Sequence, residues 1–343
     1  MKRLFSFVAA ACFSILLFIF PQAAAVGAAH GIKICKDVLL PSLFPFMIIS
    51  CFISFCGACE VFALCFLPVT ALFKIPKASA GIWISSFVGG FPSGAQSICS
   101  LYHIGTLSKT DAENLISCCV CSGPAFLILA VGSQMLGSMN IGIILYLSQV
   151  ISVMMLTAIF CRSNNVNRFA VSAQYLSFEN SLVNAVSHSA NSMISIFAFV
   201  IFFSVVTEIF KNVIPFPTAF LPFLEVTLGC EYAALMKNGY SILFIAFLCG
   251  FGGFSVCFQI LSLAKSCDLR PNYYWRIRFL NGLLCSFISG VMMNLFPYHI
   301  AAFSPAASSD LLMIWSVDRL LGGVCLACML MLSMQKLDFN SKS

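Results

Sequence analysis

The chain has 343 residues, of which 60% are hydrophobic and only 9% are charged, and its formal net charge is +6. Long apolar runs recur from end to end, which excludes a soluble globular protein and favours membrane-spanning segments. These runs are continuous rather than alternating, so they predict helices and exclude a transmembrane β-barrel. The basic residues stand in short loops between the runs, as topogenic charges do, and do not indicate a nucleic-acid partner. The sequence therefore predicts an all-α, polytopic integral membrane protein whose surroundings are the lipid bilayer.

The N-terminal 160 residues contain the first group of apolar segments. Residues 1–30 combine two basic residues, an apolar run over 4–25 and a small-residue stretch, which fits either an N-terminal anchor or a signal-like helix. We favour a retained anchor, because more spanning segments follow. Residues 31–160 are expected to form a first repeat plus a linking helix, with apolar segments at 38–57, 60–75, 79–104, 115–137 and 140–160.

A polar connector at 161–181 divides the chain, and a second group of apolar segments follows it. Residues 182–300 are expected to form a second repeat, and residues 301–343 a last transmembrane helix at 311–333 with a polar tail. The two halves show the same order of elements, and FVGGF at 87–91 matches FLCGF at 247–251. Weak repeats with interrupted helices in matching places are typical of secondary transporters. The remaining segments of the second half are 183–210, 223–236, 240–264 and 279–297.

The stretch GGFPSGAQ, residues 89–96, interrupts the segment 79–104 near its middle. Pro92 lacks a backbone N–H, and the glycines allow backbone conformations that other residues resist. We expect two half-helices that meet at a tip, with Ser93 capping the second one. The free N–H groups at such a helix start carry partial positive charge, which suits an anion.

The second half contains a matching break in CGFGGFSVCFQ, residues 249–259. Gly250, Gly252 and Gly253 supply the flexible backbone, and Ser255 and Gln259 supply polar groups. A third irregular point is SGP, residues 122–124, inside the segment 115–137. The alternative interpretation is that all three are small-residue packing faces and proline kinks without a ligand, which are common in membrane helices.

Four sequence blocks, in this order and spacing, resemble a known family. GGFPSGAQ is followed by GTLSKTDAENL and SGPAFLI, and the second half carries GFGGFSVCFQILSL. Together they resemble the sporulation integral membrane proteins of the YlbJ type, within the nucleoside-recognition Gate domain group. The resemblance covers residues 31–300, so the repeats at 31–160 and 182–300 correspond to Gate-like repeats.

The resemblance implies a multi-pass membrane protein of an endospore-forming bacterium, with inverted repeats that each contain a re-entrant helical hairpin. It further implies transport of dipicolinic acid, a small aromatic dicarboxylate, across the outer forespore membrane. The substrate-binding candidates follow from the matched motifs, with Gln96 added from the polar character of the first break. They are Gly90, Pro92, Ser93, Gly94, Gln96, Ser122, Gly123, Pro124, Gly252, Gly253, Ser255 and Gln259.

Ionisable residues inside predicted spans are functional candidates by default. They are His188, Glu208 and the adjacent pair Asp318–Arg319, and of these His188 and Asp318 are candidate coupling-proton sites. The alternative places Glu208 and the adjacent pair near the membrane interface. Outside the spans, KTDAEN at 109–114 is typical of a solvated helix start, with Thr110 or Asp111 as its cap.

The orientation of the second half is left open by its charges. If both glycine-broken segments are re-entrant, Arg270, Arg276 and Arg278 fall outside, against the positive-inside rule. Either the segment 240–264 spans the membrane fully or the rule is weak in this chain.

The eighteen cysteines stand mostly in apolar segments, where free Cys behaves as a small hydrophobe. The cluster at 118–121 leaves a metal or redox site as the alternative, but no second cysteine pair accompanies it at metal-site spacing. Paired carboxylates and a nucleophile beside a base are also missing from the sequence. The sequence therefore predicts no enzymatic activity, no metal site and no cofactor.

The sequence and the resemblance together predict a sporulation-associated membrane transporter of a small organic anion, with dipicolinic acid as the candidate substrate. A non-transporting scaffold needed for spore maturation and a transporter of a nucleoside-like solute are the alternatives. The coupling ion and the oligomeric state are not predicted.

Overall fold

The structure is a computed structural model, and it describes residues 2–57, 64–75, 78–103, 105–161, 177–213, 220–236 and 239–295. The last transmembrane helix expected at 311–333, with Asp318 and Arg319, lies outside the described residues. So does most of the polar connector at 161–181.

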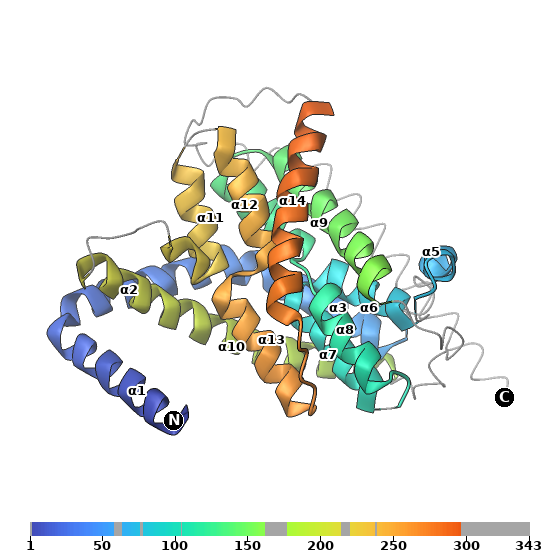
Figure 1. Ribbon diagram of the computed structural model, residues 1–343, viewed down its shortest axis with the longest axis horizontal. Coiled ribbons are helices and arrows are strands. Elements are labelled where there is room, and N and C mark those ends of the chain that lie inside the picture. The colour runs from blue at the N-terminus through green and yellow to red at the C-terminus, as the bar shows by residue number, and fades with distance from the viewer. Residues whose placement is uncertain are drawn as a thin grey trace. The chain divides into compact units, whose positions relative to one another are not determined.

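The described residues form helices and short connections, without a strand (Figure 1). Five helical stretches are long and apolar enough to cross a membrane: 21–55, 139–160, 178–212, 240–266 and 274–295. This confirms the predicted class, an all-helical polytopic membrane protein.

The α-helices are α1 (Lys2–Ile19), α2 (Pro21–Ile34), α3 (Leu40–Phe55), α5 (Leu67–Leu72), α6 (Ala78–Gly89), α7 (Phe91–His103), α8 (Lys109–Cys118), α9 (Met139–Phe160), α10 (Phe178–Val213), α11 (Val226–Leu235), α12 (Gly239–Phe251), α13 (Gly253–Ser266) and α14 (Tyr274–Leu295). π-Helical turns occupy Cys35–Leu39 and Ala125–Met135, and 3₁₀ turns occupy Leu64–Phe66 and Leu221–Phe223.

The N-terminal segments differ from the prediction. The first helix ends at Ile19, before Pro21, rather than running over 4–25. From Pro21 the chain is helical to Phe55, because a π-helical turn joins α2 to α3. Polar residues between the predicted segments 4–25 and 38–57, such as Lys33 and Lys36, are exposed on one side of this helix. An amphipathic helix accommodates them without a break.

Glycines let α2 approach α10 closely. A Cβ at Gly27 would lie 2.8 Å from the Ser204 carbonyl oxygen, and one at Gly31 would lie 2.8 Å from the Ser204 Oγ. Small residues at a helix contact allow such backbone approach, as is common between membrane helices. Helix α10 also packs along α3, while α14 packs against α9 and α12.

The helix start in KTDAEN has a different cap from the one predicted. Ser108 is the N-cap of α8, and its hydroxyl accepts a hydrogen bond from the Asp111 N–H at 3.1 Å. The Ser108 hydroxyl also donates to the Asp111 carboxylate at 2.8 Å. Ser108 therefore takes the capping role, one residue before the stretch in which we expected it.

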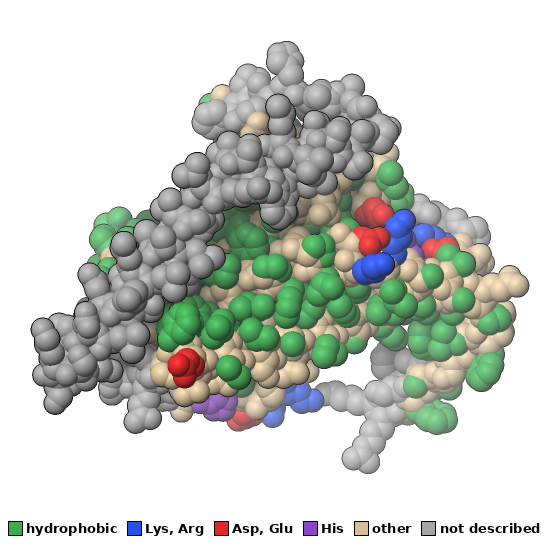
Figure 2. All heavy atoms as spheres, turned by 180° about the vertical axis from the view of Figure 1, so that it is seen from behind, with side chains coloured by type: hydrophobic (Ala, Val, Ile, Leu, Met, Phe, Trp, Pro, Cys, Tyr) green, Lys and Arg blue, Asp and Glu red, His purple; other side chains and the backbone are tan. Residues whose placement is uncertain are grey.

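The outer surface of the described helices is largely apolar. Figure 2 shows one face on which hydrophobic side chains are spread widely, with charged side chains gathered in a few places. Large side chains such as Phe18, Ile194 and Phe287 are exposed, with 87%, 65% and 70% of their surface free. Such extensive exposed apolar surface marks a protein in contact with lipid.

Candidate functional site

The first break is a helical hairpin that turns at Gly90. Gly90 has a φ of +80°, in the left-handed region that favours glycine, and α6 and α7 pack against each other. The Ser93 hydroxyl, on α7, donates to the Ser85 carbonyl, on α6, at 2.8 Å. A Cβ at Gly94 would come within 2.0 Å of the Ser86 Oγ, so the two arms are closer than any side chain at 94 permits.

The expected role of Ser93 as a helix cap is wrong. Its hydroxyl donates to two carbonyls, those of Ser85 and Gly90 (3.1 Å), and no backbone N–H donates to it. Helix α7 begins earlier, at Phe91, and Pro92 lies in its first turn, where a missing N–H costs little. The side chain of Ser93 thus holds the hairpin closed instead of starting its second arm.

The second break has a different shape. Gly252 and Gly253 have φ values of +92° and +69°, and α13 continues from α12 in Figure 1. Residues 240–266 form one apolar stretch long enough to span a membrane. The first turn of α13 is also partly occupied, because the Ser255 N–H donates to the Leu224 carbonyl at 3.0 Å. The second glycine-broken segment is therefore a bent span rather than a hairpin.

The third irregular point lies against the tip of the first. Residues 119–124 separate α8 from the π-helix at 125–135. A Cβ at Gly123 would lie 3.2 Å from the Gly90 backbone nitrogen, and one at Gly90 would lie 3.0 Å from the Gly123 nitrogen. The two tips therefore meet backbone to backbone, without an intervening side chain.

The three breaks meet at a partly open cavity of ≈ 60 Å³, whose mostly apolar lining includes residues of α3 and α10. Five of the predicted site residues line it, and at least one comes from each break. They are Gly90, Ser122, Gly123, Ser255 and Gln259. The hydroxyls of Ser122 and Ser255 are buried, and neither has a hydrogen-bond partner among the described residues. Unpartnered buried hydroxyls are uncommon, and these two are available to a molecule in the cavity.

Six of the other predicted residues belong to the same breaks but do not line the cavity. Gln96 is directed elsewhere, because its amide donates to the Ser192 hydroxyl on α10 at 3.2 Å. Ser93 and Gly94 hold the hairpin together, as described above. The other three outside the cavity lining are Pro124, Gly252 and Gly253. The side chain of Pro92 lies outside the described part of the structure. A solute-binding role for any of the twelve stays a prediction.

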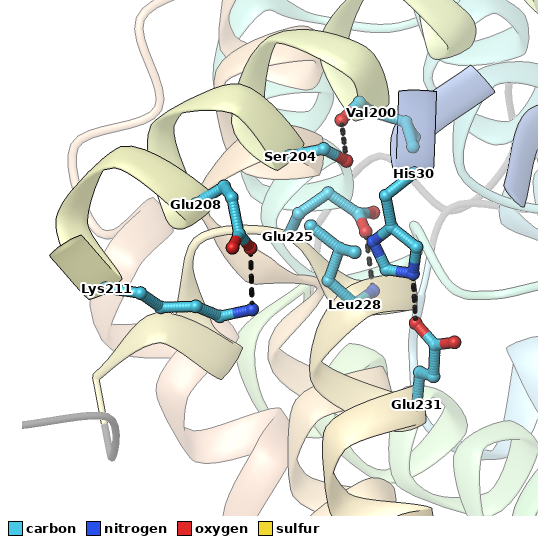
Figure 3. Close-up of polar contacts among 8 residues, drawn as sticks. All are labelled: His30, Val200, Ser204, Glu208, Lys211, Glu225, Leu228 and Glu231. Carbon is cyan, nitrogen blue, oxygen red and sulfur yellow. Dashed lines mark hydrogen bonds and ion pairs between the residues drawn. The ribbon is translucent and has the colours of Figure 1, made fainter. Parts of the chain in front are cut away.

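The sequence analysis missed Glu225, which lines the cavity and is only 1% exposed. Its carboxylate caps α11, accepting a hydrogen bond from the Leu228 N–H at 2.8 Å (Figure 3). The carboxylate also accepts from the Thr227 hydroxyl at 3.1 Å. Glu225 lies between the candidate spans 178–212 and 240–266, and its burial raises the pKa of its carboxyl, although hydrogen bonds to Leu228 and Thr227 counteract this. An acid directly before an apolar helix is a capping pattern that would have identified it.

The sequence analysis also placed Arg278 in a loop, whereas it is fully buried in α14. Its Nε donates to the Phe251 carbonyl at 3.0 Å, and its Nη1 donates to the Val120 carbonyl. The guanidinium carbon lies 5.5 Å from the centroid of the Phe91 ring. Arg278 therefore contacts all three breaks at once. The buried face of α14 repeats at helical spacing and includes position 278, so periodicity would have identified this residue.

The two charged candidates that the structure describes, Glu208 and His188, do not line the cavity. Glu208 pairs with Lys211 at 2.9 Å near the end of α10 (Figure 3), which supports the interface interpretation for Glu208. The Nδ1 of His188, on α10, lies 3.9 Å from the Cys51 sulfur. Figure 3 also shows a pair that the sequence did not suggest, between His30 and Glu231 at 3.2 Å.

The cysteine cluster lies at the third break. Cys118, Cys119 and Cys121 are free and buried. Within the described ranges, no three His, Cys, Asp or Glu side chains are grouped so that they could hold a metal ion. The Cys121 sulfur contacts the Ser86 carbonyl at 3.4 Å, so this thiol packs between the third break and the hairpin.

The fold and the three converging breaks define a polytopic helical membrane protein with interrupted helices at one cavity. The chain is similar to the sporulation integral membrane protein YlbJ of Bacillus subtilis (strain 168), with 23% identity over 333 residues. The similarity covers 83% of this chain and 81% of that protein, and it confirms the YlbJ-type resemblance of the motifs. No family profile matches the chain. No solved structure matches it.

Proposed function

We propose that the protein is a sporulation-associated transporter of a small organic anion, with dipicolinic acid as the first candidate, in the outer forespore membrane. One observation carries the proposal: three backbone breaks, far apart in the sequence, converge on one cavity with two unpartnered hydroxyls. Interrupted helices that meet at a binding site are typical of secondary transporters. The name of the similar protein supports the link to sporulation. The proposal includes no enzymatic step.

The size of the cavity suggests which state of a transport cycle the structure represents. A volume of ≈ 60 Å³ holds a few water molecules, given about 10–15 Å³ for one. Binding pockets for small molecules are about 300–1,000 Å³. An aromatic dicarboxylate therefore enters only if the tips separate, and the contact between Gly90 and Gly123 is the place where separation enlarges the cavity most directly. We assign the structure to a closed state of alternating access.

Reconstitution of the purified full-length protein in lipid vesicles tests the proposal. Saturable uptake of radiolabelled dipicolinate, competed by unlabelled dipicolinate but not by nucleosides, is the expected result. Competition by nucleosides alone would favour a nucleoside-like solute instead. Vesicles that take up neither compound above the protein-free background would contradict transport.

Variants of the second break test whether uptake depends on the polar groups that line the cavity. Ser255→Ala and Gln259→Ala remove polar groups that line it, and we expect both to reduce uptake at unchanged protein levels. Ser266→Ala is the matched control, because Ser266 lies on the same helix but is exposed and bonds only within its own end of α13. Equal uptake by all three variants would place the solute elsewhere.

A non-transporting scaffold is the second candidate function. The specific observation in its favour is that the second break is held by protein groups, as in the bond from the Ser255 N–H to the Leu224 carbonyl. A scaffold predicts that Ser255→Ala and Gln259→Ala support normal spore maturation in cells. It also predicts that maturation fails when charges in the polar connector at 161–181, or the exposed charges Arg270 and Arg276, are replaced.

A further inference from the structure

We infer that the guanidinium of Arg278 is the group that binds a carboxylate of the transported solute. The inference rests on the proposed function and adds to it the residue that would select an anion. It replaces the expectation, drawn from the sequence, that free N–H groups of the half-helices alone supply the positive charge.

The first argument is that the buried charge of Arg278 is incompletely satisfied. The residue is 0% exposed, and among the described residues its Nη2 has no hydrogen-bond partner of good geometry. The thiol of Cys257 also contacts the guanidinium, but a neutral thiol is a weak acceptor and supplies no counter-charge. None of the ion pairs found in the described part of the chain includes Arg278. A buried cation without a counter-charge is costly, and so is a buried donor without an acceptor. An anion that arrives at Nη2 would relieve both costs.

The second argument is that bracing the second break does not require a positive charge. The Gln149 amide donates to the Cys249 carbonyl at 3.0 Å, and the Asn281 amide donates to the Gly250 carbonyl at 2.8 Å. These neutral side chains hold the end of α12 in the same way that Arg278 holds the Phe251 carbonyl. A structural brace alone would therefore be served by an amide at 278. The charge is the property that distinguishes Arg278 from its neighbours.

The third argument concerns position. Phe91 lines the cavity, and Arg278 lies over the ring of the same residue. Nη2 is directed toward Gly252, where a Cβ would lie 3.0 Å from that nitrogen and 3.5 Å from the Phe91 ring. The unpartnered nitrogen is thus one side chain away from the cavity. Rotation of Phe91 during opening would join Nη2 to the space that Ser122 and Ser255 line.

The chemistry of a guanidinium identifies the class of ligand. Its charge is delocalised over planar N–H donors that match the oxygens of a carboxylate. Because the Nε hydrogen and one hydrogen of Nη1 are donated to carbonyls, the two hydrogens of Nη2 and the second hydrogen of Nη1 remain for the solute. The unpartnered hydroxyls of Ser122 and Ser255 can donate to further oxygens of the same molecule. The site is therefore suited to a small carboxylate with several acceptor oxygens.

The test measures binding to the full-length protein in lipid nanodiscs with radiolabelled dipicolinate. We expect Arg278→Gln to raise the Kd about tenfold or more, with Arg278→Lys intermediate because it retains the charge without the planar fork. Arg276→Gln is the matched control, since Arg276 is two residues away on the same helix and is exposed. Unchanged affinity in Arg278→Gln, with wild-type binding intact, would overturn this inference while leaving the proposed function standing.

A ligand series on the wild-type protein covers the case in which Arg278→Gln does not fold. Dipicolinate, picolinate and the neutral dipicolinamide have the same ring and differ in carboxylate number. Affinity should fall along that series, and the diamide should compete about tenfold or more less well than dipicolinate. Equal competition by the diamide would contradict the inference. If none of the three compounds binds, the proposed function is overturned, and this inference with it.

Discussion

The two glycine-broken segments have similar sequences but different shapes. The first folds back at Gly90 into a hairpin, whereas the second continues through Gly252 and Gly253 as a bent span. The difference lies in the residues that flank the glycines. In the first break Gly94 lets α7 lie against Ser86, but the matching position of the second break is Phe254. Glycine permits a chain reversal, and small residues on both arms are needed to close it.

This difference bears on the orientation of the chain. The conflict of Arg270, Arg276 and Arg278 with the positive-inside rule arose from treating both breaks as re-entrant. The structure favours the first of the two explanations, that the second glycine-broken segment spans the membrane, because residues 240–266 are long and apolar enough to do so. Arg278 also does not count as a loop charge, because it is buried in α14. The repeat relation between the two halves, including its inversion, stays a prediction.

The largest expected effect comes from making the first break resemble the second. Gly94→Phe places a ring where even a Cβ would lie 2.0 Å from the Ser86 Oγ. We expect the hairpin to open and the free energy of unfolding to fall by about 3 kcal/mol or more, which is the upper range for overpacking. Denaturation of the purified protein in detergent measures this change.

Gly81→Ala is the control for that variant. Position 81 lies on α6 of the same hairpin, and a Cβ there meets nothing within 4 Å. Because alanine favours a helix over glycine, stability should be equal or slightly higher, by about 0.5–1 kcal/mol. If Gly94→Phe is as stable as Gly81→Ala, close packing of the arms does not set the shape of the first break.

A smaller effect is expected from Gly252→Ala in the second break. The left-handed conformation at φ +92° costs a side-chain-bearing residue about 1–3 kcal/mol, and the Cβ would lie 3.0 Å from the Arg278 Nη2. Gly105→Ala separates the two causes, because Gly105 has a φ of +81° and open space around it. We expect Gly252→Ala to unfold at the lower temperature in a thermal melt. Equal melting temperatures would mean that the contact with Arg278 contributes nothing.

Asn281→Ala tests the polar bracing that α14 gives to the second break. The Asn281 amide donates to the Gly250 carbonyl, and its oxygen accepts from the Ser152 hydroxyl at 2.6 Å. Removing these bonds leaves buried groups unpaired, so we expect a loss of about 1–3 kcal/mol in the free energy of unfolding. Asn294→Ala, at an exposed position of the same helix, should change stability little. If Asn294→Ala lost more stability than Asn281→Ala, this bracing would be excluded.

The smallest expected effect is a pH dependence of dipicolinate binding. It distinguishes Glu225, which lines the cavity, from acidic residues outside it. Because burial raises the pKa of Glu225, its carboxyl is neutral at low pH and gains a negative charge as the pH rises through that pKa. The charge would repel an anion in the cavity, so dipicolinate binding should weaken with rising pH. We expect Glu225→Gln to flatten this dependence.

Glu231→Gln should retain the wild-type pH dependence. Glu231 lies on the same helix, but its side chain is 41% exposed and pairs with His30. Binding that strengthens as the pH rises, over a range in which the solute stays fully ionised, would show that Glu225 does not control the cavity.

The sequence predicted the helices well where long apolar runs determine them, and it located all three breaks. It did not predict which break folds back, because that depends on side chains that meet only in the folded hairpin, such as Gly94 and Ser86. The two buried charges were missed for a related reason. Arg278 stands among loop charges in the sequence, and only the helical register of α14 shows that it faces inward. Glu225 lies in an irregular stretch whose burial depends on the packing of α11.

The contact between Gly90 and Gly123 has a consequence for how fast the site opens. Two smooth backbones meet there, so their separation disrupts no interlocked side chains at the point of contact. The barrier to opening then depends mainly on the groups around that point, such as the Cys121 sulfur at the Ser86 carbonyl and the Phe91 ring against Arg278. A methyl group at 123 would act as a wedge between the tips. Gly123→Ala should turn an alternating carrier into a leaky one, and vesicles containing it would lose preloaded solute.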